Sequence, residues 1–208
     1  MLTEPATKRA VVFIDGQNLY FAAKEAFGFT YPNYDPLKLA QRICLDKSWS
    51  LTQTRFYTGI PDETDNPMWR QFWNAKLDHM GRIGVHTFRR TLKYRHEPVR
   101  LPDGRETKVR IGREKGIDVR IALDVLRLAI DNVYDVAVLL SQDQDLSEVV
   151  DEVRDISRAH GRWIKLASAF PVSDRTRNTR GINKTDWLKI DRELYDSCID
   201  RRDYRKLP

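Results

Sequence analysis

Only two cysteines, Cys44 and Cys198, occur in the 208 residues, and they lie far apart without the spacing of a disulfide pair or a zinc site. The sequence has no apolar run near the roughly 20 residues that a membrane-crossing helix needs. Its first ten residues, MLTEPATKRA, lack the basic-then-apolar pattern of a signal peptide. These absences argue against a disulfide framework and a structural zinc site. They predict a soluble, cytoplasmic protein with no membrane contact.

The sequence is also poor in histidine, with four residues that are scattered singly and form no ligand or catalytic cluster. No glycine-rich phosphate loop or dinucleotide-binding pattern is present, which argues against chemistry on a nucleotide cofactor. Hydrophobic residues make up 41% of the chain, and this is enough to build a core and to exclude wholesale disorder. The length is typical of one domain of ordinary size.

The positive charge is concentrated in one segment. Between Arg89 and Lys115 there are ten Lys and Arg residues and four Asp and Glu residues, a difference equal to the net charge of +6 of the whole chain. A localised basic patch is typical of a protein that binds a polyanion. A solvated surface hairpin is the alternative, since a run of charges alone does not distinguish the two.

Short apolar runs alternate with segments of helical periodicity. Residues 10–14 and 134–140 have the composition of central strands that are buried on both faces. Further strands are expected at 52–58, 83–92 and 163–167, and helices at 18–27, 36–44, 66–80, 116–130 and 146–160. This alternation predicts an α/β fold with a central, mainly parallel sheet flanked by helices.

The basic segment interrupts this pattern. Pro102-Asp103-Gly104 lies between two strand-like runs, 99–101 and 107–111, and is a good signal for a hairpin turn. The expected organisation is an N-terminal tail (1–9), one α/β domain (10–171) with a basic hairpin insertion at about 92–113, and a helical C-terminal extension (172–208) packed on the domain.

Acidic residues follow the two most apolar strands. Asp15 comes directly after the first, and Asp143 and Asp145 follow the second. Asp118 opens the apolar helix that leads into the second strand. Ligands of open α/β sheets bind beyond the carboxyl ends of the strands. If the two strands are neighbours, Asp15, Asp143 and Asp145 converge on one edge of the sheet. The helix that opens at Asp118 feeds the second strand, which allows its start to approach the same edge.

Carboxylates held a few ångströms apart repel each other strongly unless a cation lies between them. A site with only oxygen ligands favours Mg²⁺ or Mn²⁺ over zinc, and such ions can assist phosphodiester cleavage. Structural roles stay open for some of these acids: Asp15 has the position of a helix cap, and Asp145 with Glu148 fits a capping box. Asp124 is expected to be a structural acid paired with Arg120 and Arg127.

Three motifs occur in order: Phe13-Ile-Asp-Gly-Gln-Asn-Leu19, Lys115-Gly-Ile-Asp-Val119, and Val138-Leu-Leu-Ser-Gln-Asp-Gln-Asp-Leu146. Together they resemble the NYN domain of the PIN-like nuclease superfamily, LabA-like branch, over about residues 10–168. The resemblance implies a PIN-like three-layer fold and a divalent-metal-dependent ribonuclease. It also implies that Asn18 helps to shape the site. The chain departs from the usual Ser-Gly-Asp-x-Asp-Phe, with Gln142 in place of Gly and Leu146 in place of the aromatic residue.

The sequence therefore predicts an endoribonuclease that acts on single-stranded or structured RNA, with DNA as a second candidate substrate and a homodimer left open. The expected catalytic residues are Asp15, Asn18, Asp118, Asp143 and Asp145, and the four acids among them are the expected ligands of Mg²⁺ or Mn²⁺. The expected substrate-binding residues are Tyr94, Arg95, Arg100, Arg105, Arg110, Arg113 and Lys115.

Parts of the sequence also fit three other functions. A phosphotransferase of the haloacid dehalogenase type needs Asp-x-Asp after the first strand, and Gln17 stands in the second position. A toprim-like nicking enzyme would use Asp143 and Asp145 but needs a Glu near the first strand, where this chain has Asp15. A non-catalytic RNA-binding or regulatory protein on a PIN-like scaffold remains the main alternative, although such a scaffold need not retain all four acids.

Overall fold

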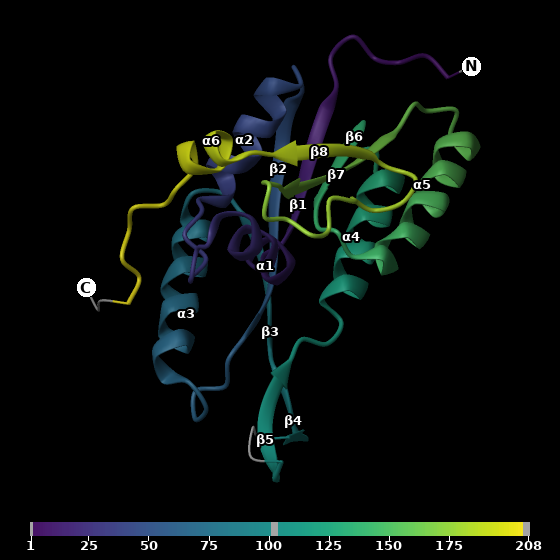
Figure 1. Cartoon of the computed structure of the whole chain (residues 1–208). Helices are drawn as coiled ribbons and strands as arrows, with labels where there is room; N and C mark the ends of the chain where they lie inside the picture. The colour runs from purple at the N-terminus through teal and green to yellow at the C-terminus, as the bar shows by residue number, and fades with distance from the viewer. Residues whose placement is uncertain (1, 101–103, 206–208) are drawn as a thin grey trace.

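The computed structural model describes residues 2–100 and 104–205, and within them six strands form one sheet in the order β3-β2-β1-β6-β7-β8 (Figure 1). The strands are Arg9–Asp15 (β1), Ser50–Ile60 (β2), His86–Thr91 (β3), Val136–Leu140 (β6), Lys165–Pro171 (β7) and Asp186–Ile190 (β8). Every neighbouring pair in this sheet is parallel. The predicted α/β fold with a mainly parallel central sheet is confirmed.

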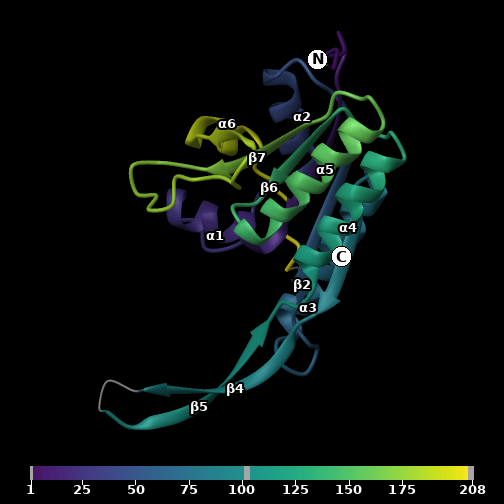
Figure 2. The ribbon, with the colours of Figure 1, turned by 90° about the vertical axis from the view of Figure 1, so that its right-hand side faces the viewer.

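Helices connect these strands and cover both faces of the sheet (Figures 1 and 2). They are Gly16–Phe27 (α1), Pro36–Asp46 (α2), Pro67–Arg82 (α3), Ile117–Ile130 (α4), Ser147–Ala159 (α5) and Arg192–Ser197 (α6), with a short 3-10 turn at Gln144–Leu146. The residues at the end of α1 and at the start of α2 explain where these helices stop and begin. Gly28 ends α1 in the left-handed conformation that glycine adopts readily, and Asp35 with Pro36 begins α2.

Strand β1 contributes to the core on both faces of the sheet, because successive side chains of a strand point to opposite faces. Val12 and Ile14 pack with residues of α1, α2, α3 and α6 in one buried cluster. Val11 and Phe13 pack with residues of α4 and α5 in another. The aromatic side chains of α3 are largely buried, including Phe72 at 3% and Trp73 at 9% exposure. This gives the three layers of a PIN-like fold.

The chain changes direction across the sheet between β1 and β6. From β1 the connection through α1 and α2 leads to β2 on one side, whereas β6 lies on the other side of β1. Ile14 pairs with Leu140 in the parallel register of these two strands. The segments that begin at Asp15 and Ser141 therefore leave the sheet side by side. This is the topological switch point at which α/β sheets bind ligands.

The basic segment forms a separate antiparallel hairpin of Lys93–Arg100 (β4) and Glu106–Arg113 (β5), which we call the arm. Figure 2 shows the arm projecting away from the body of the protein. The expected hairpin is present with longer strands than the sequence indicated, and most of the expected turn lies outside the described residues. The arm returns to the body at Glu114, three residues before α4 begins at Ile117.

The segment after residue 172 differs from the expected set of short helices, since it contains β8 as well as α6. β8 was missed because it is an edge strand whose first four residues are exposed or only partly buried, so it shows no apolar run. Tyr195 and Tyr204 from this segment are buried in the core. None of the described helices is both long enough and apolar enough to cross a membrane.

Candidate active site

Asp15 joins the first core strand to the first helix. It is the last residue of β1 and the N-cap of α1, where its Oδ1 accepts a hydrogen bond of 3.0 Å from the backbone N–H of Asn18. Its exposure is only 4%. The structural role that the sequence left open for Asp15 is therefore real.

The segment after β6 holds the second pair of acids. Asp143 caps the 3-10 turn by accepting a hydrogen bond of 3.0 Å from the backbone N–H of Asp145. The capping box that the sequence left open for Asp145 and Glu148 does not form. The 3-10 turn moves the start of α5 to Ser147, and this helix has no side-chain cap. Asp145 itself is exposed.

Two further acids lie near the start of α4: Glu114 precedes the helix and Asp118 lies within it. Asp118 lies in the first turn of this helix, which begins after Gly116. Gly116 has a φ of 72°, a left-handed conformation that disfavours most other residues. This turn brings the chain from the arm directly into the helix. As a result, Glu114 and Asp118 approach the same end of the sheet as Asp15.

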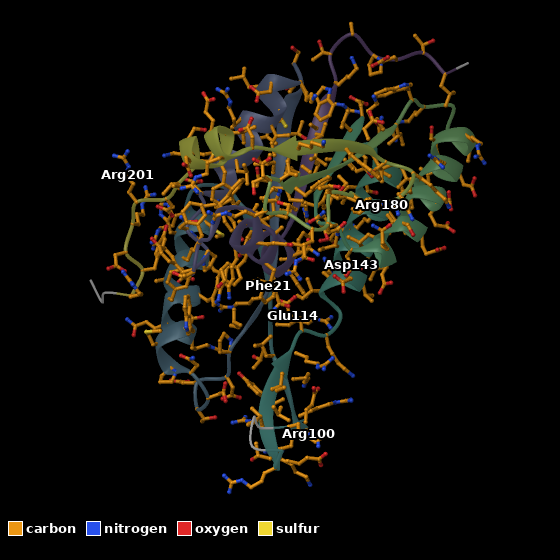
Figure 3. The ribbon with its side chains drawn as sticks, viewed as in Figure 1. Phe21, Arg100, Glu114, Asp143, Arg180 and Arg201 are labelled. Carbon is orange, nitrogen blue, oxygen red and sulfur yellow. The ribbon has the colours of Figure 1, made fainter. Side chains whose placement is uncertain are left out.

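The acids from these segments line one depression of about 500 Å³. Figure 3 labels Glu114 and Asp143 at this end of the sheet, above the arm. The lining residues are Asp15, Gln17, Asn18, Phe21, Ile111, Gly112, Arg113, Glu114, Asp118 and Asp143. Three of the four predicted acids are therefore brought together with Asn18. Asp145 is not in the lining, although its charge acts on Asp118.

Burial and mutual repulsion perturb the acids of this depression. Burial raises the pKa of Asp15 to about 7 against the lowering effect of its hydrogen bond from Asn18, and the charges of Asp118 and Asp143 raise it further. The pKa of Glu114 is also raised to about 7, by burial first and then by Asp15 and Asp118. Burial and the charges of Asp143 and Asp145 raise the pKa of Asp118. Such perturbed acids in a cleft are typical of functional sites.

Glu114 is the site residue that the sequence reasoning missed, since it was counted only as one acid within a basic segment. Its Oε1 accepts a hydrogen bond from the backbone N–H of Gly59, at the end of β2. A side chain at position 59 would begin 2.5 Å from the Cγ of Glu114, so any residue larger than glycine would displace Glu114. The available signal was its position, an acid between Arg113 and Lys115 and four residues before Asp118.

The nearby basic groups do not neutralise these acids. Among the described residues, none of Asp15, Glu114, Asp118 and Asp143 forms an ion pair. Arg113, which lines the depression, pairs instead with Glu97 at 2.8 Å. Within residues 2–100 and 104–205, no three Asp, Glu, His or Cys side chains already form a group that could hold a metal ion. The carboxylates are neighbours, but they do not form a closed cage.

Hydrogen bonds tie the two acid-bearing segments together and to the C-terminal region. The Oδ1 of Asn18 accepts a hydrogen bond of 3.0 Å from the backbone N–H of Gln142. The side-chain amide of Gln142 donates to the carbonyls of Asn178 and Arg180, at 2.9 and 2.8 Å. Gln142, which departs from the expected glycine, therefore anchors residues 178–180 beside the site.

Asp124 is a structural acid, as predicted, but one of its expected partners is wrong. Arg120 contacts it at 2.7 Å, whereas Arg127 pairs with Asp131. Asp124 also accepts hydrogen bonds from Tyr57 at 2.8 Å and from Arg55 at 3.1 Å. Burial alone would raise the pKa of Asp124, but these partners lower it below its usual value.

Several residues of the arm also have structural contacts. The guanidinium of Arg110 lies 4.2 Å from the ring centroid of Tyr94 and 3.4 Å from the carboxylate of Asp65. The hydroxyl of Tyr94 accepts a hydrogen bond of 3.1 Å from the backbone N–H of Asp62. Arg95 and Arg100 are exposed on β4. The arm thus has a fixed base at Tyr94 and exposed positive charge further out.

A parallel α/β sheet with acids at its switch point is the arrangement expected of a PIN-like nuclease fold. The sequence profile of the NYN domain matches residues 9–173. The chain therefore belongs to the NYN domain family, within the PIN-like nuclease superfamily, as the motifs predicted. The NYN domain is generally a nuclease domain. No curated protein sequence matches the chain.

Three solved structures are similar to the chain to different degrees. A protein of unknown function, VPA0982 from Vibrio parahaemolyticus, has a TM-score of 0.52 at 18% identity, covering 92% of this chain and 98% of that one. Ribokinase from Giardia lamblia has a TM-score of 0.35 at 11% identity, covering 86% and 51%. MurG from Acinetobacter baumannii has a TM-score of 0.32 at 7% identity, covering 87% and 45%. At 18% identity the likeness to VPA0982 concerns the fold alone, and the TM-scores of the other two structures are too low to indicate the same fold.

Proposed function

We propose that this protein is a divalent-metal-dependent ribonuclease that hydrolyses phosphodiester bonds in single-stranded or structured RNA. The observation that carries the proposal is the convergence of Asp15, Glu114, Asp118 and Asp143 in one depression, where none of them has a cationic partner among the described residues. Membership of a nuclease family supports the same conclusion. The alternative of a toprim-like enzyme is disfavoured by that membership.

The donor set fits Mg²⁺ or Mn²⁺. The four residues offer only carboxylate oxygens, which hard divalent cations prefer, and no Cys or His lines the depression. A cation between the carboxylates would offset the repulsion that raises the pKa of Asp15 and Glu114. Asp15, Asp118 and Asp143 would hold the ion, with Asp145 and Glu114 beside them. When bound, it would lower the pKa of a water and stabilise charge on the phosphate.

The protein's own groups have separate tasks in this proposal. Asn18 fixes the spacing between the segment after β1 and the segment after β6 through its bond to Gln142. In the metal-free protein the pKa of Glu114 is raised to about 7, mainly by burial, and burial would keep it above its ordinary value beside a bound cation, closer to the range in which a side chain exchanges protons effectively at neutral pH. It is therefore suited to exchange a proton with the attacking water or with the departing oxygen.

We further propose that the arm binds the phosphate backbone of the substrate. β5 ends at Arg113 and lines the acidic depression through Ile111 and Gly112, so the arm is continuous with the site. Its exposed basic residues offer charge to a strand that passes from the site along the arm. An open depression with a long flanking arm suits cleavage within an RNA strand rather than only at its ends.

The test is a cleavage assay on labelled single-stranded RNA and on DNA of the same sequence, with Mg²⁺, with Mn²⁺ and with EDTA. We expect RNA cleavage that EDTA abolishes and that Asp15→Asn reduces by at least 100-fold. Asp131→Asn, which changes an exposed acid at the far end of α4, is the matched control and should cleave normally. RNA binding without cleavage under every condition would instead identify a non-catalytic RNA-binding protein.

A further inference from the structure

A second depression, of about 410 Å³, lies beside the acidic one and has a different chemical character. Aromatic and apolar side chains supply much of its lining. The lining residues are Gly16, Gln17, Tyr20, Phe21, Thr30, Pro32, Thr58, Gly59, Pro61, Trp69, Trp73 and Leu92. Gln17 and Phe21 line both depressions. The two are therefore adjoining parts of one surface, with Phe21 between them.

Phe21 is exposed in a way that packing does not explain. Helix α1 buries Leu19, Ala22 and Ala23 against the sheet, whereas Phe21 is 55% exposed. Its ring centroid lies 5.3 Å from that of Tyr20, in a tilted arrangement. The hydroxyl of Tyr20 donates to the carbonyl of Thr30 at 3.0 Å, which fixes Tyr20 against the wall of the depression. The result is an accessible aromatic face held next to the acids.

We propose that this aromatic depression binds one unpaired base of the RNA, next to the phosphate that the acidic depression receives. This inference rests on the proposed function, since the phosphate fixes where the neighbouring base must lie. The volume is in the range of small-ligand sites. Flat aromatic side chains stack on unpaired bases without strong sequence preference. The amide of Gln17 can donate to and accept from the edge of a base.

Continuity with the acidic depression favours a nucleic-acid base over other occupants. A base and its phosphate are covalently linked, so a substrate that places the phosphate among the acids carries a base to within reach of Phe21. A double helix would keep its bases stacked and out of reach. The depression therefore selects single-stranded or looped RNA over duplex RNA.

The experiment uses single-stranded RNA with one 2-aminopurine, whose fluorescence falls when it stacks on an aromatic ring. Binding is measured in EDTA by fluorescence and by anisotropy, and cleavage is measured separately in Mg²⁺. Phe21→Ala should weaken binding about 5- to 150-fold and abolish the quenching, because a base–aromatic stack contributes on the order of 1–3 kcal/mol. Phe21→Trp should retain both. Leu45→Ala, at a 70% exposed apolar residue of α2, is the control and should change neither.

The two hypotheses fail in different ways. Cleavage in Mg²⁺ with quenching and affinity unchanged by Phe21→Ala would overturn the base site and leave the nuclease intact. Quenching that depends on Phe21, without cleavage, would support the base site and contradict the nuclease. An absence of quenching in the wild-type protein would overturn the base site. So would a dimer in solution that Phe21→Ala dissociates, since the depression would then bind a second copy of the chain.

Discussion

The side chain of Asn18 accepts a hydrogen bond of 3.0 Å from the backbone N–H of Gln142, and this bond joins the segments that carry Asp15 and Asp143. The two segments leave neighbouring parallel strands, so their spacing is already restricted by the register of β1 and β6. The hydrogen bond to Asn18 further restricts the distance between the two segments beyond the ends of the strands. It connects the fold directly to the geometry of the acidic depression.

Replacing Asn18 should therefore affect activity more than stability. Asn18→Ala removes one partly buried hydrogen bond and should lower the free energy of unfolding by about 1 kcal/mol. We expect kcat for RNA cleavage to fall at least tenfold while KM changes little, because the acids lose alignment and the arm is untouched. Denaturant unfolding and steady-state kinetics measure the two effects. The control is Asn74→Ala, which removes the hydrogen bond of 3.1 Å that Asn74 in α3 accepts from Arg89. An equal loss of kcat and of the free energy of unfolding in this variant would contradict the role of Asn18.

Asp15 should destabilise the metal-free protein at neutral pH. Its pKa in the folded protein is raised to about 7, so the folded state binds an extra proton between roughly pH 4 and pH 7. The contribution of Asp15 to the free energy of unfolding is thus fully present below about pH 4 and is lost as the pH rises to about 7. Asp15→Asn, which retains the helix cap, should raise the free energy of unfolding at pH 8 by on the order of 1–3 kcal/mol.

The same comparison tests the cation. Thermal unfolding of both proteins at pH 4 and pH 8 should show a difference at pH 8 that closes at pH 4. Mn²⁺ at pH 8 should raise the Tm of the wild-type protein and leave that of Asp15→Asn nearly unchanged. An Asp15→Asn variant less stable than wild type at pH 8 would show that Asp15 is a satisfied structural acid.

The contribution of Asp124 to stability should depend on pH in the opposite sense to that of Asp15. Burial tends to raise the pKa of Asp124, but Tyr57, Arg55 and Arg120 outweigh this effect and lower it. The charged carboxylate therefore stabilises the fold above the unfolded pKa of about 3.9. Asp124→Asn should cost about 2–4 kcal/mol at pH 7. The loss should shrink as the pH falls below about 4, where the wild-type carboxylate becomes protonated. Cleavage should persist at temperatures where the variant stays folded.

The arm should contribute to RNA binding through charge. Arg95, Arg100 and Lys108 are exposed. Replacing all three with Ala should flatten the dependence of log K on log salt by roughly 2, given about 0.7 for each phosphate contact to a single strand. A triple variant at Lys8, Arg42 and Lys47, on the opposite end of the protein from the arm, removes the same charge and is the control. Equal slopes in the arm variant and wild type would make the arm a solvated hairpin or a protein contact.

Apolar runs and helical periodicity predicted most of the fold, because β1 and β6 are buried on both faces and α3 carries its aromatic residues at helical spacing. β8 could not be predicted in this way, since an edge strand with exposed side chains has no such run. Asp15, Asp118 and Asp143 could be placed at one edge because each adjoins a predicted strand or helix end. Glu114 could not, because its contact with Gly59 joins residues 55 positions apart.

The local structure around Asp145 could also not be predicted from the sequence. The 3-10 turn at Gln144–Leu146 shifts the start of α5 and leaves Asp145 exposed, whereas the spacing of Asp145 and Glu148 alone fits a capping box. The role of Gln142 depends on residues 178–180, which lie far along the chain. Such long-range contacts form only when the whole domain folds.

The central claim is that acids from separate segments act together as one cation site that cleaves RNA. The most direct test is Mn²⁺ binding by electron paramagnetic resonance, with RNA cleavage followed in the same samples, for wild type and for Asp15→Asn, Asp118→Asn and Asp143→Asn. We predict that each substitution weakens Mn²⁺ binding at least tenfold and reduces cleavage at least as much, while Asp131→Asn changes neither. RNA cleavage that persists in EDTA, or Mn²⁺ binding unaffected by all three substitutions, would contradict the account.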